Sequence, residues 1–228
     1  SRTRDLNSAM GDFDKALSLD SSFHEALYNK SYFQLEHGQF RDGWAGYEYR
    51  FFIPRFGLWN YCDYPKWDGK PLDGILLIRG EQGLGDQILF VSVLTDIQEI
   101  TKNIVLQIEP RLVALFRTIR VIGTKEKKPE GIVAQSTLGS LPRFCRNSIE
   151  DFTRKQTSYL VADEARVKEF HTALGASYKT HIGISWHSKT KLFSRQKSIS
   201  LTDLKLLSGL PEVDLVDLQY GDMFAEKE

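Results

Sequence analysis

Hydrophobic residues follow two different rhythms along this chain of 228 residues. Up to about residue 57 they recur every three or four positions, a spacing that places them on one face of an α-helix. From Gly74 onward, short apolar runs alternate with amphipathic stretches. Strands that alternate with helices through short connections are typical of a parallel α/β sheet. The pattern therefore predicts a helical segment followed by an α/β region.

The boundaries of the predicted elements follow from the apolar runs and the residues that flank them. We expect strands at Ile75–Arg79, Ile104–Ile108, Ile132–Gln135, His181–Trp186 and Val213–Gln219, and helices at Gln87–Ile100, Arg111–Ile119, Ala162–Leu174 and Thr202–Ser208. Pro110 precedes the second of these helices and Gly175 follows the third, which are positions that proline and glycine favour.

The helical segment, residues 1–57, also has an internal period. Phe13 and Tyr47 occupy equivalent places 34 residues apart, which is the period of tetratricopeptide (TPR) repeats. Gly38-Gln39-Phe40 falls where such a repeat turns between its two helices. Arg50 departs from the pattern, because it stands where a small residue is usual. We predict TPR-like repeats here, and an ordinary helical hairpin is the alternative.

Residues 58–73 differ in character from both neighbours, because Trp, Tyr, Pro and Gly crowd together there. Proline and glycine rule out a long helix, and the aromatic residues argue against a flexible linker. We interpret this stretch as a structural junction that packs on both neighbours.

The composition narrows the classes of function. The chain carries 30 basic and 30 acidic residues, whereas a protein that neutralises nucleic-acid phosphates usually has an excess of Lys and Arg. No apolar run approaches the roughly 18 residues of a membrane helix, and no signal peptide opens the sequence. Cys62 and Cys145 are too few for a disulfide framework or a zinc site. We expect a cytoplasmic protein without nucleic-acid partner, membrane span, metal or cofactor.

The first strand of the α/β region is followed by RGEQGLGDQILF, residues 79–90, in which three glycines precede a helix. Ligands gather at the carboxyl ends of parallel strands, where the next helix presents free N–H groups. The stretch is neither a phosphate-binding Walker loop nor a dinucleotide fingerprint, since its glycines run G-x-x-G-x-G and Asp86 follows at once. Asp86 is either a helix cap or a catalytic carboxylate that the glycines bring close to a substrate.

A second candidate loop, HSKTKLFSRQKSIS, follows the strand predicted at His181–Trp186. It is rich in lysine, arginine and hydroxyl groups and contains no acid, which suits a diphosphate because phosphate oxygens need several charged donors. A solvated loop with ordinary lysines is the alternative. His187 ends the strand, and we interpret it as a binding contact rather than a general base.

Several motifs, in this order, resemble bacterial proteins that join TPR repeats to a glycosyltransferase of the lipopolysaccharide heptosyltransferase kind. They are GQFRDGWAGYEYRF, KWDGKPLDG, EQGLGDQILF, TLGSLPRF and HIGISWHSKTK…RQKSISL. The resemblance implies a glycosyltransferase-B (GT-B) fold, in which two Rossmann-like domains face each other across a cleft. The acceptor meets the first domain and the nucleotide-sugar meets the second.

Carried over by position, the resemblance makes Asp86 the catalytic base, with Gly83, Gly85 and Gln87 forming the acceptor-side turn. In the second domain it assigns the donor phosphates to a loop whose residues we take to be His187, Ser188, Lys189, Lys197 and Ser198. TLGSLPRF predicts a tight turn before a helix, where Thr137 and Ser140 either bond an acceptor or form a structural corner.

The domains expected from these signals are TPR-like helices at 1–57, a junction at 58–73, a Rossmann-like acceptor domain at 74–178 and the start of a Rossmann-like nucleotide-sugar domain at 179–228. His181 to Glu228 comprise 48 residues, too few for a complete domain of that kind. We expect an inverting glycosyltransferase that uses a nucleoside-diphosphate-sugar donor, with TPR helices that recruit a protein or peptide acceptor, and we expect these 228 residues alone to be inactive. The rival is an inactive TPR-based interaction module.

Overall fold

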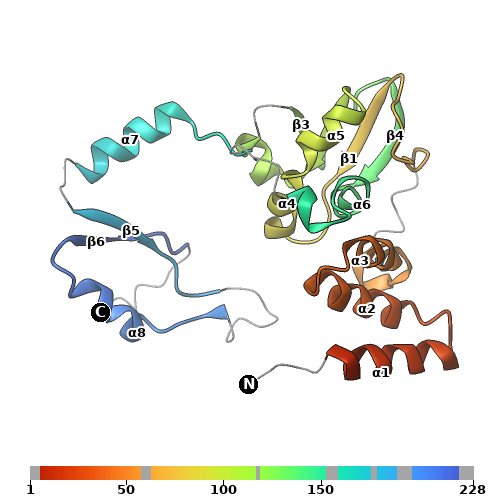
Figure 1. The fold of residues 1–228 in the computed structure, drawn as a ribbon. Coiled ribbons are helices and arrows are strands. Elements are labelled where there is room, and N and C mark those ends of the chain that lie inside the picture. Colours follow the sequence, from red (N-terminus) through yellow and green to blue (C-terminus); the bar gives the residue numbers. More distant parts are fainter. Residues whose placement is uncertain are drawn as a thin grey trace. The chain divides into compact units, whose positions relative to one another are not determined.

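The computed structural model describes residues 6–57, 63–116, 119–152, 159–175, 179–188 and 197–220. The chain divides into two compact units, Ser1–Val161 and Ala162–Glu228 (Figure 1). It is a mixed α/β protein with a parallel sheet, so the coarse fold class predicted from the sequence is confirmed. Within the described ranges, no helix combines the length and the apolar character that crossing a membrane requires.

The first unit begins with helices. They are α1 (Leu6–Leu19), α2 (His24–Glu36) and α3 (Phe40–Tyr47), followed by the 3-10 turns η1 (Glu48–Phe52) and η2 (Pro54–Phe56). The predicted turn between α2 and α3 is present at Gly38, whose φ of 76° is left-handed. The helices α2 and α3 approach closely at Gly46, where an added Cβ would lie 2.8 Å from the Cβ of Ser31. A larger side chain at position 46 would therefore push the two helices apart.

A sheet of four parallel strands follows in the order β3-β2-β1-β4. The strands are β1 (Ile75–Arg79), β2 (Ile104–Ile108), β3 (Arg120–Gly123) and β4 (Ile132–Thr137). The predicted strands at β1, β2 and β4 are confirmed. The sequence reading missed β3, because Val121 and Ile122 are too short an apolar run to indicate a strand.

Two predicted helices of this unit are wrong in extent. In place of one helix over Gln87–Ile100, the chain forms α4 (Leu84–Val91) and α5 (Leu94–Ile100). The break arises because Ser92 and Val93 bond carbonyls three residues back rather than four. The helix expected at Arg111–Ile119 is the 3-10 turn η4 (Pro110–Leu115), which ends at extended Phe116.

After β4 the chain makes further short turns before the first unit ends. These are η5 (Leu138–Ser140), α6 (Pro142–Cys145) and η6 (Ile149–Phe152). The sequence TLGSLPRF therefore forms the tight turn before a helix that its glycine and proline predicted.

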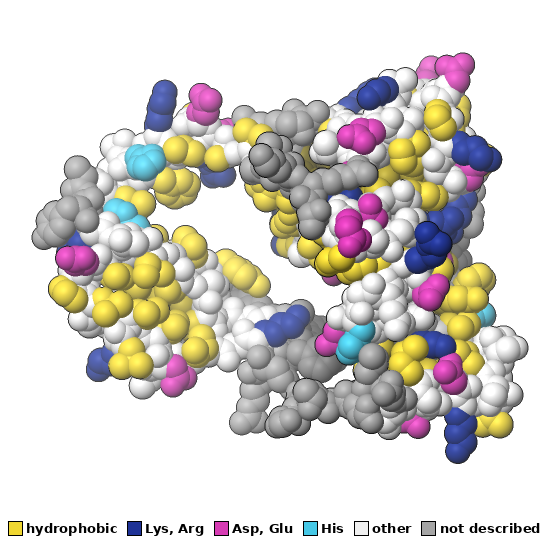
Figure 2. Space-filling view, viewed as in Figure 1, with side chains coloured by type: hydrophobic (Ala, Val, Ile, Leu, Met, Phe, Trp, Pro, Cys, Tyr) yellow, Lys and Arg dark blue, Asp and Glu magenta, His cyan; other side chains and the backbone are white. Residues whose placement is uncertain are grey.

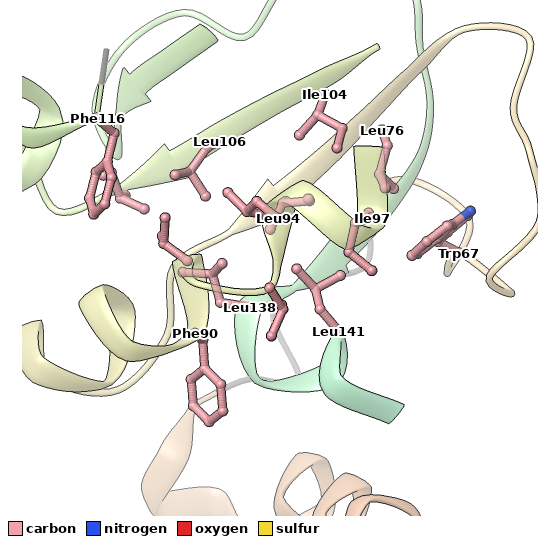
Figure 3. Packing of buried hydrophobic residues seen from close by; sticks show 14 of the residues in the cluster. Trp67, Leu76, Phe90, Leu94, Ile97, Ile104, Leu106, Phe116, Leu138 and Leu141 are labelled. Atoms are coloured by element: carbon pink, nitrogen blue, oxygen red, sulfur yellow. The ribbon is translucent and has the colours of Figure 1, made fainter. Parts of the chain in front are cut away.

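The helices and the sheet of the first unit share one hydrophobic core. Tyr28 and Tyr47 from the helical segment belong to the same buried cluster as Phe90 and Leu138 from the α/β region. Figure 3 shows side chains of this cluster meeting between the strands and the helices that cover them, among them Leu76, Leu94, Ile97, Leu106 and Leu141. The helical segment is thus packed as part of the first unit.

The described part of the junction, residues 63–73, lies along β4. Trp67 is buried, its backbone N–H donates to the carbonyl of Gln135 at 2.8 Å, and Lys66 forms a parallel bridge with the same residue. The indole also joins the shared core. This agrees with a structural junction, while residues 58–62 lie outside the described ranges.

The second unit has one more strand–helix–strand sequence. Its elements are α7 (Glu164–Leu174), β5 (Thr180–Ile184), α8 (Leu201–Ser208) and β6 (Val213–Asp217). The strands β5 and β6 pair in parallel, and all four elements agree with the predicted ones within three residues at each end. Most side chains in this unit are partly or fully exposed, and Trp186 is buried.

Candidate functional site

The glycine-rich turn leaves the sheet at the carboxyl end of its β1 strand. β1 is bordered by β2 on one side and β4 on the other, so the strand order changes direction at this point. Open α/β sheets bind ligands at such a switch point, outside the carboxyl ends of the strands. The turn is therefore in the position where the fold favours a site.

Asp86 is the third residue of α4 and closes the first turn of that helix. Its Oδ2 accepts a hydrogen bond of 2.9 Å from the backbone N–H of Gly83, the residue that caps the helix. The side chain is only partly buried, and among the described residues no hydrogen-bond partner is present for Oδ1. The carboxylate thus caps the helix with one oxygen while the other has no partner among the described residues and the side chain stays partly exposed, so the two interpretations made from the sequence are compatible.

The other predicted residues of this turn have distinct surroundings. Gly83 is extended, with φ −86° and ψ 173°, and Gly85 is exposed with open space beside it. Gln87 is buried, and its Oε1 accepts from the backbone N–H of Glu109 at 3.1 Å. A Cβ on Gly80 would lie 2.5 Å from that same oxygen, so the amide packs against the backbone of the turn. Gln87 therefore positions the turn, whereas Gly83 and Gly85 leave its outer side open.

A buried ion pair fixes Glu81, which stands two residues before Gly83. Arg50 in η1 reaches Glu81 through two parallel hydrogen bonds, Nε to Oε2 at 2.9 Å and Nη2 to Oε1 at 2.8 Å. Both side chains are 0% exposed. Glu81 Oε1 also accepts from the backbone N–H of Gly139 at 2.8 Å. The carboxylate therefore bridges the helical segment and the turn that follows β4.

The guanidinium of Arg50 lies between the carboxyl ends of β1 and β4. In addition to Glu81, its Nη2 contacts Thr137 Oγ1 at 2.9 Å and Ser140 Oγ at 2.7 Å. Its Nη1 donates to the carbonyl of Tyr47 at 2.9 Å. Burial acts to lower the pKa of Arg50, but hydrogen bonding and the charge of Glu81 raise it, so the group is cationic. Thr137 and Ser140 are buried and bond this guanidinium. Of the two interpretations made from the sequence, these contacts agree with the structural corner.

Glu48 supplies a second carboxylate to the same cluster. Its Oε1 accepts from Arg50 at 2.9 Å and from Ser140 at 2.6 Å, and its Oε2 accepts from Lys66 and Arg143. Burial acts to raise the pKa of Glu48, yet the charge of Arg50 and these hydrogen bonds hold it at about 2. The cluster thus joins four segments of the first unit through ionised groups.

Gln82, the next residue of the turn, is held from the helical segment as well. Its φ of 60° is left-handed, which is uncommon for a residue other than glycine. Its Nε2 donates to the hydroxyl of Tyr47, and burial raises the pKa of that tyrosine. Two consecutive turn residues are therefore anchored by Tyr47 and Arg50, one helical turn apart.

Sequence reasoning missed this cluster. It treated Arg50 as a departure from the TPR pattern and gave Glu81 no role. The available signal was an arginine inside the aromatic run Tyr47–Phe52, where a charge is costly unless it is paired. The partner could not be inferred, because it lies 31 positions along the chain.

The loop predicted to bind donor phosphates lies in the second unit, and only its two ends are described. Ser188 N–H donates to Ser198 Oγ at 3.0 Å, so the structure brings these two residues together. His187 N–H donates to Gln219 Oε1 at 2.9 Å, and Lys197 is exposed. Lys189 lies outside the described residues.

Gln219 is a second residue that the sequence reading did not single out. Its side chain follows β6 and bonds the backbone after β5, accepting from Trp186 N–H at 3.0 Å and donating to the carbonyl of His187 at 3.1 Å. It fixes the carboxyl end of β5 where the predicted loop begins. In the part of the chain that the structure describes, no three His, Cys, Asp or Glu side chains gather as metal ligands.

These features define an α/β protein with an accessible carboxylate at the switch point of a parallel sheet. The chain is similar to Protein FlbA of Caulobacter vibrioides, with 31% identity over 81% of this chain and 35% of FlbA. The chain therefore spans about a third of the length of this relative. No model of a known protein family matches the chain, and no solved structure matches it significantly.

Proposed function

We propose that the protein is an inverting glycosyltransferase of GT-B type, in which Asp86 is the catalytic base. The observation that carries the proposal is the state of the Asp86 carboxylate. One oxygen is fixed by the N–H of Gly83, the other has no hydrogen-bond partner among the described residues, and the side chain is partly exposed after the carboxyl end of β1. A general base needs both a fixed orientation and an accessible acceptor atom.

In the proposed reaction an acceptor hydroxyl gives its proton to Asp86 Oδ1 while its oxygen attacks the anomeric carbon of the donor. The bond from that carbon to the diphosphate breaks, and the electron pair leaves with the diphosphate. Attack opposite the leaving group inverts the configuration. Gly83 and Gly85 carry no side chain that would obstruct an acceptor at the turn.

The donor would bind in the second unit, which we propose to be the start of the Rossmann-like nucleotide-sugar domain. Ser188 and Ser198, brought together at 3.0 Å, and the exposed Lys197 are groups that can bind phosphate oxygens. His187 and Lys189 complete the proposed phosphate-binding set. Because the chain spans only 35% of FlbA, we propose this activity for the full-length protein and not for these 228 residues alone.

The helical segment would recruit the acceptor as a TPR-like platform. A cavity of about 570 Å³ beside α3 supports this role. It is lined by Arg41, Ala45, Glu48, Tyr49, Phe52, Arg143 and Asn147. Arg41 and the two aromatic rings can bind an acidic peptide segment that carries an apolar side chain, whereas Arg143 is already paired with Glu48.

The test compares two substitutions of Asp86 in the full-length protein. Asp86→Asn keeps an oxygen that can accept from Gly83 N–H but removes the basic carboxylate, so turnover should fall at least ~100-fold with little change in stability. Asp86→Ala should lose the same activity and in addition about 1 kcal/mol of stability, because the helix loses its cap. Transfer is measured with a panel of nucleoside-diphosphate-sugars, and stability by denaturant unfolding.

If Asp86→Asn retains the turnover of the unmodified protein, Asp86 only caps the helix and the mechanism is wrong. If neither the unmodified protein nor Asp86→Asn transfers sugar from any donor, while both bind the same peptide partner through the helical segment, the protein is an interaction module. Peptide binding is measured by fluorescence anisotropy, with Arg41→Ala expected to weaken it.

A further inference from the structure

We infer that Arg50 and Glu81 form a positioning pair, through which the helical segment sets the geometry of the turn that carries Asp86. The inference rests on the proposed function for its catalytic consequence. It gives the helices a second role besides recruitment: they would be a part of the acceptor-side site.

The first observation is the covalent closeness of the pair to the turn. Glu81 and Gln82 stand immediately before Gly83, whose N–H holds the Asp86 carboxylate. Both of them are bonded by the helical segment, Glu81 by Arg50 and Gln82 by Tyr47. Gly80, Glu81 and Gln82, which connect β1 to Gly83, are therefore each held by a hydrogen bond, so the backbone before Asp86 is restrained at each of these residues.

The second observation is the geometry of the pair. Two parallel hydrogen bonds between a planar guanidinium and a carboxylate fix orientation as well as distance. The remaining contacts of the guanidinium, with Thr137 and Ser140, fix it to the end of β4. Arg50 thus connects the turn after β1 to the end of the neighbouring strand β4. Lysine could not reproduce this arrangement, because its ammonium group lacks the planar pair of donors.

A third observation separates this pair from an ordinary structural ion pair. Arg146 and Asp96 form a comparable pair in the same unit, 2.7 Å apart, with 2% and 12% of their side chains exposed. That pair joins α5 to the end of α6 and includes no residue of the Gly80–Asp86 turn. Arg146 Nη2 donates to Asp96 Oδ2, so this pair is a control for the loss of a buried, carboxylate-bound guanidinium away from the turn.

The experiment compares Arg50→Lys with Arg146→Lys in the full-length protein. Both changes keep a positive charge and remove a buried planar guanidinium, so both reduce stability. Arg50→Lys should lower kcat about tenfold or more with KM for both substrates changed less than about threefold, because misplacing a catalytic group by about 1 Å costs up to ~100-fold in rate. It should also increase amide hydrogen exchange over residues 81–86. Arg146→Lys should change neither kcat nor the hydrogen exchange of residues 81–86.

A double variant, Arg50→Met with Glu81→Gln, addresses variants that fold poorly. Gln at position 81 can still accept from Gly139 N–H, and Glu48 retains Lys66 and Arg143, so no charge of the pair is left buried alone. Folding should recover relative to Arg50→Met, whereas kcat should stay at least about tenfold low and exchange over residues 81–86 should stay high. Recovery of kcat together with stability would overturn the inference.

The exchange measurement separates this inference from the proposed function. If the unmodified protein transfers no sugar, the proposed function fails, and faster exchange over residues 81–86 in Arg50→Lys alone still supports the positioning pair. If exchange over these residues is equal in Arg50→Lys and Arg146→Lys, the pair is only structural and the inference is wrong, whatever the activity.

Discussion

The two units of the chain are built from the same local pattern but differ in burial. In the first unit, the middle residues of β1, from Leu76 to Ile78, are fully buried. In the second unit, β5 and β6 consist of exposed and partly exposed residues. Leu206 in α8 is 85% exposed, and Figure 2 shows hydrophobic side chains gathered on the visible face of this unit.

The difference shows that a strand–helix–strand sequence does not create a core by itself. β1 has a strand on each side and helices packed on the sheet, whereas in the described part of the second unit β5 and β6 pair with each other alone. Sheets of two strands are marginally stable without further packing. The proposed base therefore follows a strand buried in the core, whereas the proposed phosphate loop follows a strand that is largely exposed.

The largest expected difference concerns the ion pairs of the two units. Arg50→Met should lower the free energy of unfolding of the first unit by about 3–5 kcal/mol, because Glu81 would remain charged and buried without its partner. Lys179→Met in the second unit should cost less than about 1 kcal/mol, since Lys179 and Asp214 are 34% and 40% exposed. Denaturant titration followed by hydrogen exchange of peptides from each unit measures both. Equal losses would contradict the contrast in burial.

A second expected difference concerns leucines at the centres of two parallel strands. Leu106→Ala in β2 should cost about 2–5 kcal/mol, because Leu106 is fully buried and its removal leaves a cavity. Leu215→Ala in β6 should cost less than half as much, since Leu215 is only partly buried. The same titration compares them, and a Leu215→Ala loss as large as that of Leu106→Ala would show that β6 is packed as tightly as β2.

The pH dependence of the first unit should reveal the Glu48 carboxylate. The pKa of the Glu48 carboxyl is about 2 in the folded protein, against 4.5 for the same group outside the cluster, as in the unfolded chain. Its contribution to the stability of the fold is therefore present above pH 4.5 and is lost as the pH falls toward 2. The full shift corresponds to roughly 3 kcal/mol. Glu48→Gln should therefore be less stable than the unmodified chain at pH 6, with the difference reduced to less than half at pH 3. A difference independent of pH would show that Glu48 is not ionised in the cluster.

The smallest expected effect is a helix cap in the second unit. Asp163 precedes α7, and its Oδ1 accepts from the backbone N–H groups of Ala165 and Arg166. Asp163→Ala should lower the stability of that helix by about 1 kcal/mol. Circular dichroism at 222 nm during thermal unfolding measures the loss, and Asp163→Asn serves as the control that keeps the cap.

Local sequence signals determined much of the fold. The strands β1 and β2 have the predicted bounds, because each is a short, mainly apolar run that is followed by a glycine or a charged residue. The turn at Gly38 and the end of α7 at Gly175 were also predicted, because glycine is favoured at such positions. The break between α4 and α5 was not, since Ser92 and Val93 are compatible with an uninterrupted helix.

The sequence by itself also indicated where a candidate site would lie. Three glycines and Asp86 directly after a buried strand indicated the turn, and the structure places it at the switch point of the sheet. What only the tertiary structure decided is how that turn is held. Arg50, Glu81 and Ser140 come from three segments far apart in the chain, and their pairing depends on the burial that folding creates. An ion pair becomes specific and rigid when water is excluded from it, and no pattern along the chain encodes that exclusion.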